Sequence, residues 1–162
     1  MALAIRQRTA APFHWPRRLA RLRRLGRGNT RMLLSAWVRL LAVDLSVRCV
    51  GVRRTARMAP RTPLGARSAP VEHWHAQNYA RWLRVAARHH LVRAECLHQS
   101  LALHQWLRAR GASSTFVIGV TRASGELRAH AWVRLDGRLV GDVDAAVAPF
   151  AELTADGAEP WL

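Results

Sequence analysis

The spacing of apolar residues changes at Gly111, and this change constrains the fold more than any other feature of the sequence. Before Gly111, apolar side chains recur at three- and four-residue steps, the pattern of helices that bury one stripe. After it, Thr115–Val120 is rich in β-branched and aromatic residues and Leu127–Leu135 alternates, which predicts a meander of three antiparallel strands. We therefore expect an α+β fold, with N-terminal helices packed on a small antiparallel sheet.

Three helices are predicted before this change, over residues 31–57, 72–89 and 95–110. Gly111 is the residue best able to take the left-handed conformation that caps the third helix. The prolines within residues 60–70 break regular structure, so the first two helices are expected to be joined by an irregular connector.

The chain carries a net charge of +16, and this charge is unevenly distributed. Every basic residue is an arginine; residues 1–43 contain no acidic residue, whereas residues 136–162 are acidic. Clustered arginine suits nucleic acid or anionic lipid, but a solvated extension is the preferred interpretation, and a nucleic-acid partner is not expected. We expect an Arg-rich flexible extension over 1–30, one catalytic domain over 31–150 and an acidic tail over 151–162.

The two cysteines, Cys49 and Cys96, are too few for a disulfide framework and suit a reducing cytoplasm. Cys49 is expected to be a small buried apolar residue. The spacing of the histidines does not converge on a ligand set, so neither a metal nor a cofactor is expected. The longest apolar stretch, Met32–Val52, is interrupted by charged residues, so we expect no membrane span, and no secretory signal before it.

Cys96 falls in the first turn of the third predicted helix. A thiol attacks a carbonyl as its thiolate, which the unpaired N–H groups and positive dipole end of a helix start favour. His130 lies on the second predicted strand, where alternation places it on the same face as Trp132. Taken singly, the thiol could be a core residue and the imidazole a structural hydrogen-bond donor. Together they suggest a nucleophile and its base.

Asp142 is the first candidate for the carboxylate that would orient His130. A two-residue Asp136-Gly137 turn would pair residue 131 with 142 and point the Asp142 side chain away from His130. A three-residue loop would pair 130 with 142 instead. We therefore predict a bulge in this hairpin, with Gly137 at positive φ. The rival carboxylates are Asp144, at the same parity, and then Asp136, which is more simply a turn former.

Four segments, over residues 95–103, 107–111, 116–120 and 129–138, together resemble one known family. This family is the lasso peptide biosynthesis B protein, in its C-terminal transglutaminase-like domain, the microcin-processing leader peptidase. The resemblance implies a papain-like and transglutaminase-like core over 31–150. It also implies that the family's catalytic positions correspond to Cys96, His130 and Asp142.

The same resemblance implies an activity. The protein would be a cysteine endopeptidase that removes the leader from a ribosomally synthesised lasso precursor peptide through a thioester. The Arg-rich extension is too short for a leader-recognition module, which makes the chain similar to the split form of the family. A separate PqqD-like protein would then deliver the leader, and an asparagine-synthetase-like macrolactam synthetase would close the ring afterwards.

Two other functions stay open. The same triad would serve an acyl-transfer enzyme or an amidase acting on another substrate. A basic scaffold that binds peptide or nucleic acid without catalysis is the alternative from a different class. Binding to phosphates would weaken steeply with ionic strength, whereas the reactivity of Cys96 would not.

Overall fold

The computed structural model describes residues 27–58, 71–90, 94–123 and 126–155. The chain divides into two units, Met1–Arg31 and Met32–Leu162, and the sheet and the site belong to the second. Several predicted features therefore lie outside the described residues. These are most of the Arg-rich extension, the proline-containing connector and residues 156–162 of the acidic tail.

Three long helices precede Gly111, as predicted. They are α2 over Arg27–Arg57, α3 over His73–Ala87 and α4 over Cys96–Arg108. Gly51 is non-helical within α2 (φ 80°, ψ 167°) and divides it, a conformation that glycine adopts at little steric cost. Gly111 has a φ of 75°, which confirms the predicted left-handed residue after α4.

The sheet has four antiparallel strands in the order β3-β2-β1-β4. The predicted meander is confirmed as β1 (Ser114–Ala123), β2 (Glu126–Leu135) and β3 (Arg138–Val140). After a short helix, α5 (Asp144–Val147), the chain adds β4 (Ala151–Ala155) beside β1. Residues 151–155, which were predicted to belong to the acidic tail, form this strand. The strand escaped prediction because its first residues are exposed and carry no buried apolar alternation.

The hairpin between β2 and β3 differs from the prediction. Leu135 pairs with Arg138, which leaves Asp136 and Gly137 as a two-residue turn. Both residues have positive φ, 50° and 77°, as a type I′ turn requires. The predicted bulge is therefore wrong, although Gly137 has the predicted sign of φ. Aspartate tolerates the left-handed region, so this pair closes the hairpin without an extra residue.

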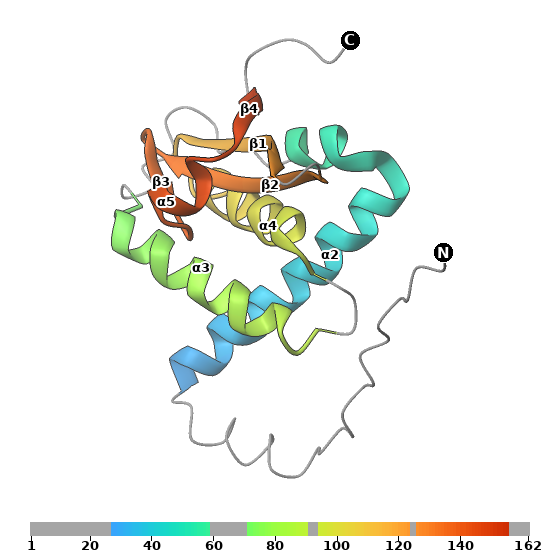
Figure 1. The fold of residues 1–162 in the computed structure, drawn as a ribbon. Helices are drawn as coiled ribbons and strands as arrows, with labels where there is room; N and C mark the ends of the chain where they lie inside the picture. Colours follow the sequence, from blue (N-terminus) through green and yellow to red (C-terminus); the bar gives the residue numbers. More distant parts are fainter. Residues whose placement is uncertain (1–26, 59–70, 91–93, 124–125, 156–162) are drawn as a thin grey trace. The chain divides into compact units, whose positions relative to one another are not determined.

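The helices pack on one side of the sheet. Figure 1 shows α4 directly beneath the strands and α3 beneath α4, in agreement with the contacts of α4 with β1, β2 and α3. Apolar side chains of β2 enter the same buried cluster as those of the helices, and this burial supplies the main favourable term in folding. The cluster includes Leu83, Leu101, Leu107, Ala131, Val133 and Leu135. The predicted α+β architecture, with helices on a small antiparallel sheet, is confirmed.

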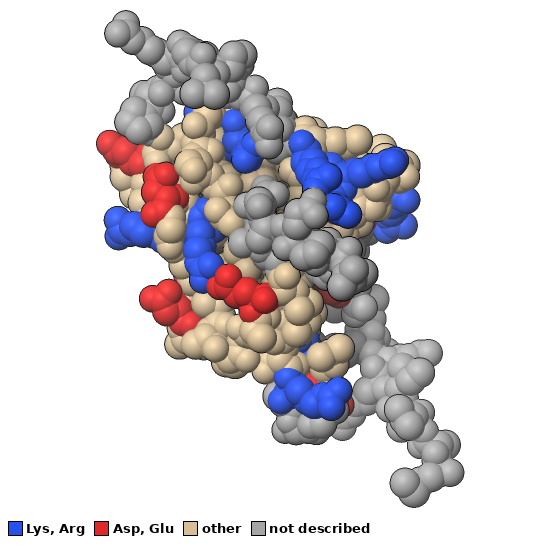
Figure 2. Space-filling view, turned by 90° about the horizontal axis from the view of Figure 1, so that it is seen from above, with Lys and Arg blue, Asp and Glu red and all other residues tan. Residues whose placement is uncertain are grey.

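Arginine side chains occur on the surface of the described residues. On the face seen in Figure 2, blue basic side chains lie at several places on the described surface, with red acidic side chains among them on one side. Among the described helices, none combines the length and the apolar character that crossing a bilayer requires.

Candidate active site

Cys96 is the first residue of α4, as expected from the sequence. Glu95 precedes it in an extended conformation. Buried apolar side chains of α4, Leu101 and Leu107 among them, anchor the helix in the core. The thiol is partly exposed. Because the first N–H groups of a helix have no partner within it, the Cys96 side chain leaves the backbone beside unpaired donors and the positive end of the dipole.

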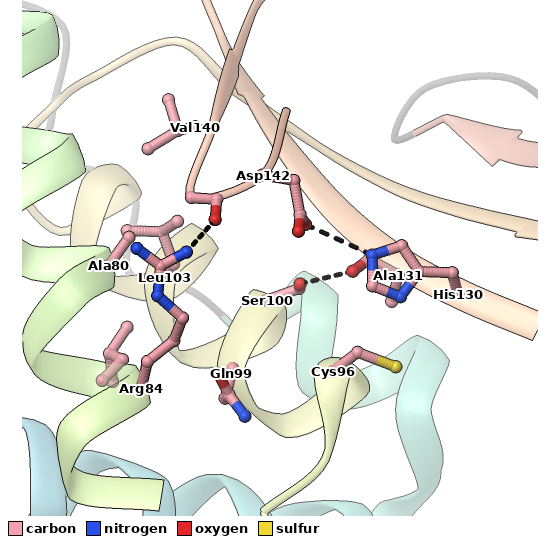
Figure 3. Close-up of a pocket in the computed structure, with 12 residues that line it drawn as sticks. Ala80, Arg84, Cys96, Gln99, Ser100, Leu103, His130, Ala131, Val140 and Asp142 are labelled. Carbon is pink, nitrogen blue, oxygen red and sulfur yellow. Dashed lines mark hydrogen bonds and ion pairs between the residues drawn. The ribbon is translucent and has the colours of Figure 1, made fainter. Parts of the chain in front are cut away.

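The three predicted residues line one pocket of about 140 Å³. Cys96 comes from α4, His130 from β2 and Asp142 from the segment after β3 (Figure 3). The remaining walls are mainly apolar, with one arginine among them. They are formed by Ala80, Leu83, Arg84, Gln99, Ser100, Leu103, Ala131, Val140 and Gly141.

His130 and Asp142 form a hydrogen-bonded pair. The distance from His130 Nε2 to Asp142 Oδ2 is 3.3 Å, and the two side chains are 23% and 29% exposed. Figure 3 shows the other ring nitrogen on the side of the ring that faces Cys96. Within the described residues the thiol and the ring share the pocket without a hydrogen bond between them. Such contacts are often long in unliganded active sites and shorten when substrate binds.

Asp142 reaches His130 because the chain leaves the sheet just before it. The pairing of β3 with β2 ends at Val140, opposite Val133. Gly141 then takes a φ of 87°, and the backbone turns away from the register that would have placed Asp142 opposite residue 131. The required departure from regular pairing therefore occurs at Gly141 and not at Gly137. A glycine directly after a short strand was the sequence signal for it.

The two rival carboxylates lie elsewhere. Asp136 occupies the hairpin turn, and Asp144 begins α5 with an exposed side chain. Asp142 is thus the candidate that the structure joins to His130.

Ser100 links the helix of the thiol to the strand of the imidazole. Its hydroxyl donates to the carbonyl oxygen of Ala131 at 2.8 Å, and the side chain is buried. Ser100 lies about one helical turn after Cys96, and Ala131 is the neighbour of His130. Ser100 was not predicted as part of the site, because a serine in an apolar helix has no distinctive spacing.

Two aromatic rings lie against the His130 ring. The ring centroids of Trp132 and Phe150 lie 6.0 and 5.5 Å from that of His130. The predicted common face of His130 and Trp132 is confirmed, whereas Phe150 was not predicted as part of the site. Gly119 makes room for this arrangement, since a Cβ there would lie 2.5 Å from Cη2 of Trp132.

Asp44 lies on α2 and contacts the first turn of α4. It is buried, accepts a hydrogen bond from Arg48 Nε at 2.8 Å and lies 3.5 Å from His98 Nε2. This pairing explains an acidic residue within the apolar pattern of α2, because a buried carboxylate requires partners. His98, in the first turn of α4, is thereby connected to a second helix.

Cys49 is exposed, contrary to the prediction that it is buried. It lies about one turn after Leu45, which is itself 61% exposed, and so shares the outer face of α2. Within the part of the chain that the structure describes, no three His, Cys, Asp or Glu side chains gather into a group able to hold a metal ion.

Comparison with known proteins identifies the family. A profile of the transglutaminase-like superfamily matches residues 37–155, a range that contains the whole pocket and ends with β4. The comparisons found no matching curated protein and no matching solved structure. The match spans well over half of the sequence and includes Cys96, His130 and Asp142. The chain belongs to the transglutaminase-like superfamily, whose fold is typical of cysteine proteases and acyltransferases.

Proposed function

We propose that this protein is a cysteine endopeptidase that removes the leader from a ribosomally synthesised lasso precursor peptide. The observation that carries the enzymatic part is the position of Cys96 at the start of α4, in one pocket with the hydrogen-bonded His130 and Asp142. The choice of a lasso precursor rests on the resemblance of residues 95–103 and 129–138 to the lasso B protein.

The reaction follows from the roles of the three side chains. The Cys96 thiolate attacks the scissile carbonyl, and N–H groups at the start of α4 stabilise the oxyanion. The His130 imidazolium protonates the leaving amine of the core peptide, so that the C–N bond breaks and a thioester with the leader remains. His130 then removes a proton from water, which hydrolyses the thioester and releases the leader carboxylate. Asp142 keeps the ring oriented throughout.

The pocket is suited to one side chain next to the scissile bond. A cavity of this size accommodates a benzene-sized group, and Leu83, Leu103 and Val140 contribute apolar walls. The proposed substrate therefore presents a single side chain of medium size to the pocket, while the rest of the peptide lies outside it.

The proposal includes two partners and a compartment. A separate PqqD-like protein binds the leader and delivers it, and an asparagine-synthetase-like macrolactam synthetase uses the released amine. The two cysteines are free, which suits a reducing cytoplasm.

Acyl transfer is the second candidate, because membership of the transglutaminase-like superfamily leaves the acceptor of the acyl group undefined. An amine would then replace water in attacking the thioester. Adding a primary amine to the reaction separates the two functions: a peptidase yields mainly the leader acid, whereas a transferase yields the leader amide at the expense of the acid.

The decisive test of the peptidase is Cys96→Ala, assayed by mass spectrometry with a precursor peptide and the leader-binding partner. The variant should lose cleavage entirely, because no nucleophile remains. Cys49→Ala is the matched control and should cleave at the wild-type rate, since Cys49 does not line the pocket. Unchanged cleavage by Cys96→Ala, or loss of cleavage only in Cys49→Ala, would overturn the assignment.

A further inference from the structure

The peptide group of Gly141 is held on both sides by helix α3. Its N–H donates to Gln77 Oε1 at 3.0 Å, and its carbonyl oxygen accepts a hydrogen bond from Arg84 Nη1. Gln77 Nε2 also donates to the carbonyl oxygen of Leu139 at 3.3 Å. Figure 3 shows Arg84 extending across the pocket wall to the Gly141 carbonyl.

The surface of α3 is shaped to receive this glycine. Gln77, Ala80 and Arg84 are spaced by three and four residues, so they lie along one face of the helix. A Cβ at Gly141 would lie 3.1 Å from the Cβ of Ala80, so the helix and the turn are in close contact. Gln77 and Arg84 therefore lie on either side of Ala80, and the turn at Gly141 packs against Ala80.

The position of Asp142 depends on this contact. Pairing of β3 with the sheet ends at Val140, so the sheet does not fix the residues that follow. Gly141 has a φ of 87°. Its N–H and carbonyl group are held by hydrogen bonds to α3 directly before Asp142. A small rotation at Gly141 would move Asp142 away from His130 Nε2.

We propose that Gln77 and Arg84 are positioning residues of the active site, which fix the Gly141 peptide and thereby keep the Asp142 carboxylate on His130. The proposal rests on the proposed catalytic function of Cys96, His130 and Asp142. It assigns no direct contact with substrate to either residue.

The proposal is tested by alkylation of Cys96 with iodoacetamide over a range of pH, in a Cys49→Ala background. Alkylation requires the Cys96 thiolate, which the His130 imidazolium stabilises, but it requires no precursor peptide. Asp142→Ala should shrink the pH range over which Cys96 is alkylated rapidly. Gln77→Ala and Arg84→Ala should shrink this range in the same way, with an alkylation rate about tenfold lower at neutral pH. Arg84→Lys retains a donor and should recover much of the rate. Arg81→Ala, an exposed arginine of α3 outside the pocket, is the matched control and should behave as the parent protein.

Combination with Asp142→Ala distinguishes positioning from a direct role. If Arg84 acts through Asp142, Arg84→Ala should cause no further loss in that background. A further loss of alkylation rate in the double variant would overturn the proposal. So would pH profiles like that of the parent protein for both Gln77→Ala and Arg84→Ala. If Gln77→Ala fails to fold by circular dichroism, Gln77→Glu replaces it: this variant keeps the acceptor for the Gly141 N–H, so it should retain the parent pH profile, and a profile like that of Asp142→Ala would overturn the proposal. Failure of the proposed function would instead appear in the parent protein, as a Cys96 that reacts no faster than an ordinary thiol.

Discussion

The two nitrogens of the His130 ring have different surroundings, and this difference assigns their roles. Nε2 faces the Asp142 carboxylate, which accepts hydrogen bonds and so favours a proton on Nε2. In the proposed mechanism, the lone pair of Nδ1 then accepts the proton of Cys96. The rings of Trp132 and Phe150 limit rotation of the imidazole, and Gly119 provides the space that Trp132 occupies.

Substitutions of Asp142 should therefore reduce activity in a graded way. Asp142→Ala removes the acceptor and should lower kcat on the order of 10²- to 10³-fold. Asp142→Asn should be less damaging, because an amide oxygen still accepts from Nε2–H although it lacks the charge that stabilises an imidazolium. Single-turnover cleavage of the precursor measures both effects. Asp144→Ala should remain near wild type, and an equal loss in that variant would show that the carboxylate has been assigned incorrectly.

Helix α4 carries Cys96 and strand β2 carries His130, so the proposed reaction depends on the relative position of these two elements. Ser100 Oγ and the Ala131 carbonyl form a buried hydrogen bond between them at 2.8 Å. Asp44 holds the first turn of α4 from α2 through His98. The first contact fixes α4 relative to the strand of His130, and the second fixes α4 relative to α2.

Ser100→Ala should reduce both stability and activity. Loss of the hydroxyl leaves a buried carbonyl without its donor, which costs about 1–3 kcal/mol in the free energy of unfolding. Urea denaturation measures this change, and kcat should fall because α4 is no longer tied beside His130. Ser46→Ala, a serine of α2 that does not line the pocket, is the control. Equal stability of the Ser100 variant and the parent would contradict a structural role for this bond.

Strand β4 is the last element of the sheet and ends the region that matches the transglutaminase-like superfamily. It pairs with β1 at the sheet edge opposite β3. Glu152 of β4 also accepts a hydrogen bond from Arg134 Nη2 of β2 at 2.6 Å, and this bond raises the pKa of Arg134 above its usual value. The last strand therefore contacts β1 through its backbone and β2 through a side chain.

Truncation tests this role of β4. A chain that ends at residue 150 should unfold at a lower temperature than the full chain, because β1 loses the partner on its outer edge. A chain that ends at residue 155 retains the strand and should keep its Tm within a degree or two, as judged by thermal circular dichroism. Equal melting of the shorter and the longer truncation would show that β4 does not contribute to stability.

The elements that depend on local preference could be predicted from the amino-acid sequence. Helical spacing located α3 and α4, the left-handed tendency of glycine marked Gly111, and alternation placed His130 beside Trp132. These features follow from periodicity and backbone sterics, which act over a few residues.

The carboxylate that contacts His130 could not be predicted from local spacing, because contacts between distant segments place it. The Asp136-Gly137 turn alone directs Asp142 away from the ring, and the chain is redirected at Gly141, where contacts from α3 hold it. The pairing of β4 with β1 and the approach of Phe150 were likewise decided by residues distant in sequence. Local spacing carries no information on such contacts, because their energy arises only when separate elements pack together.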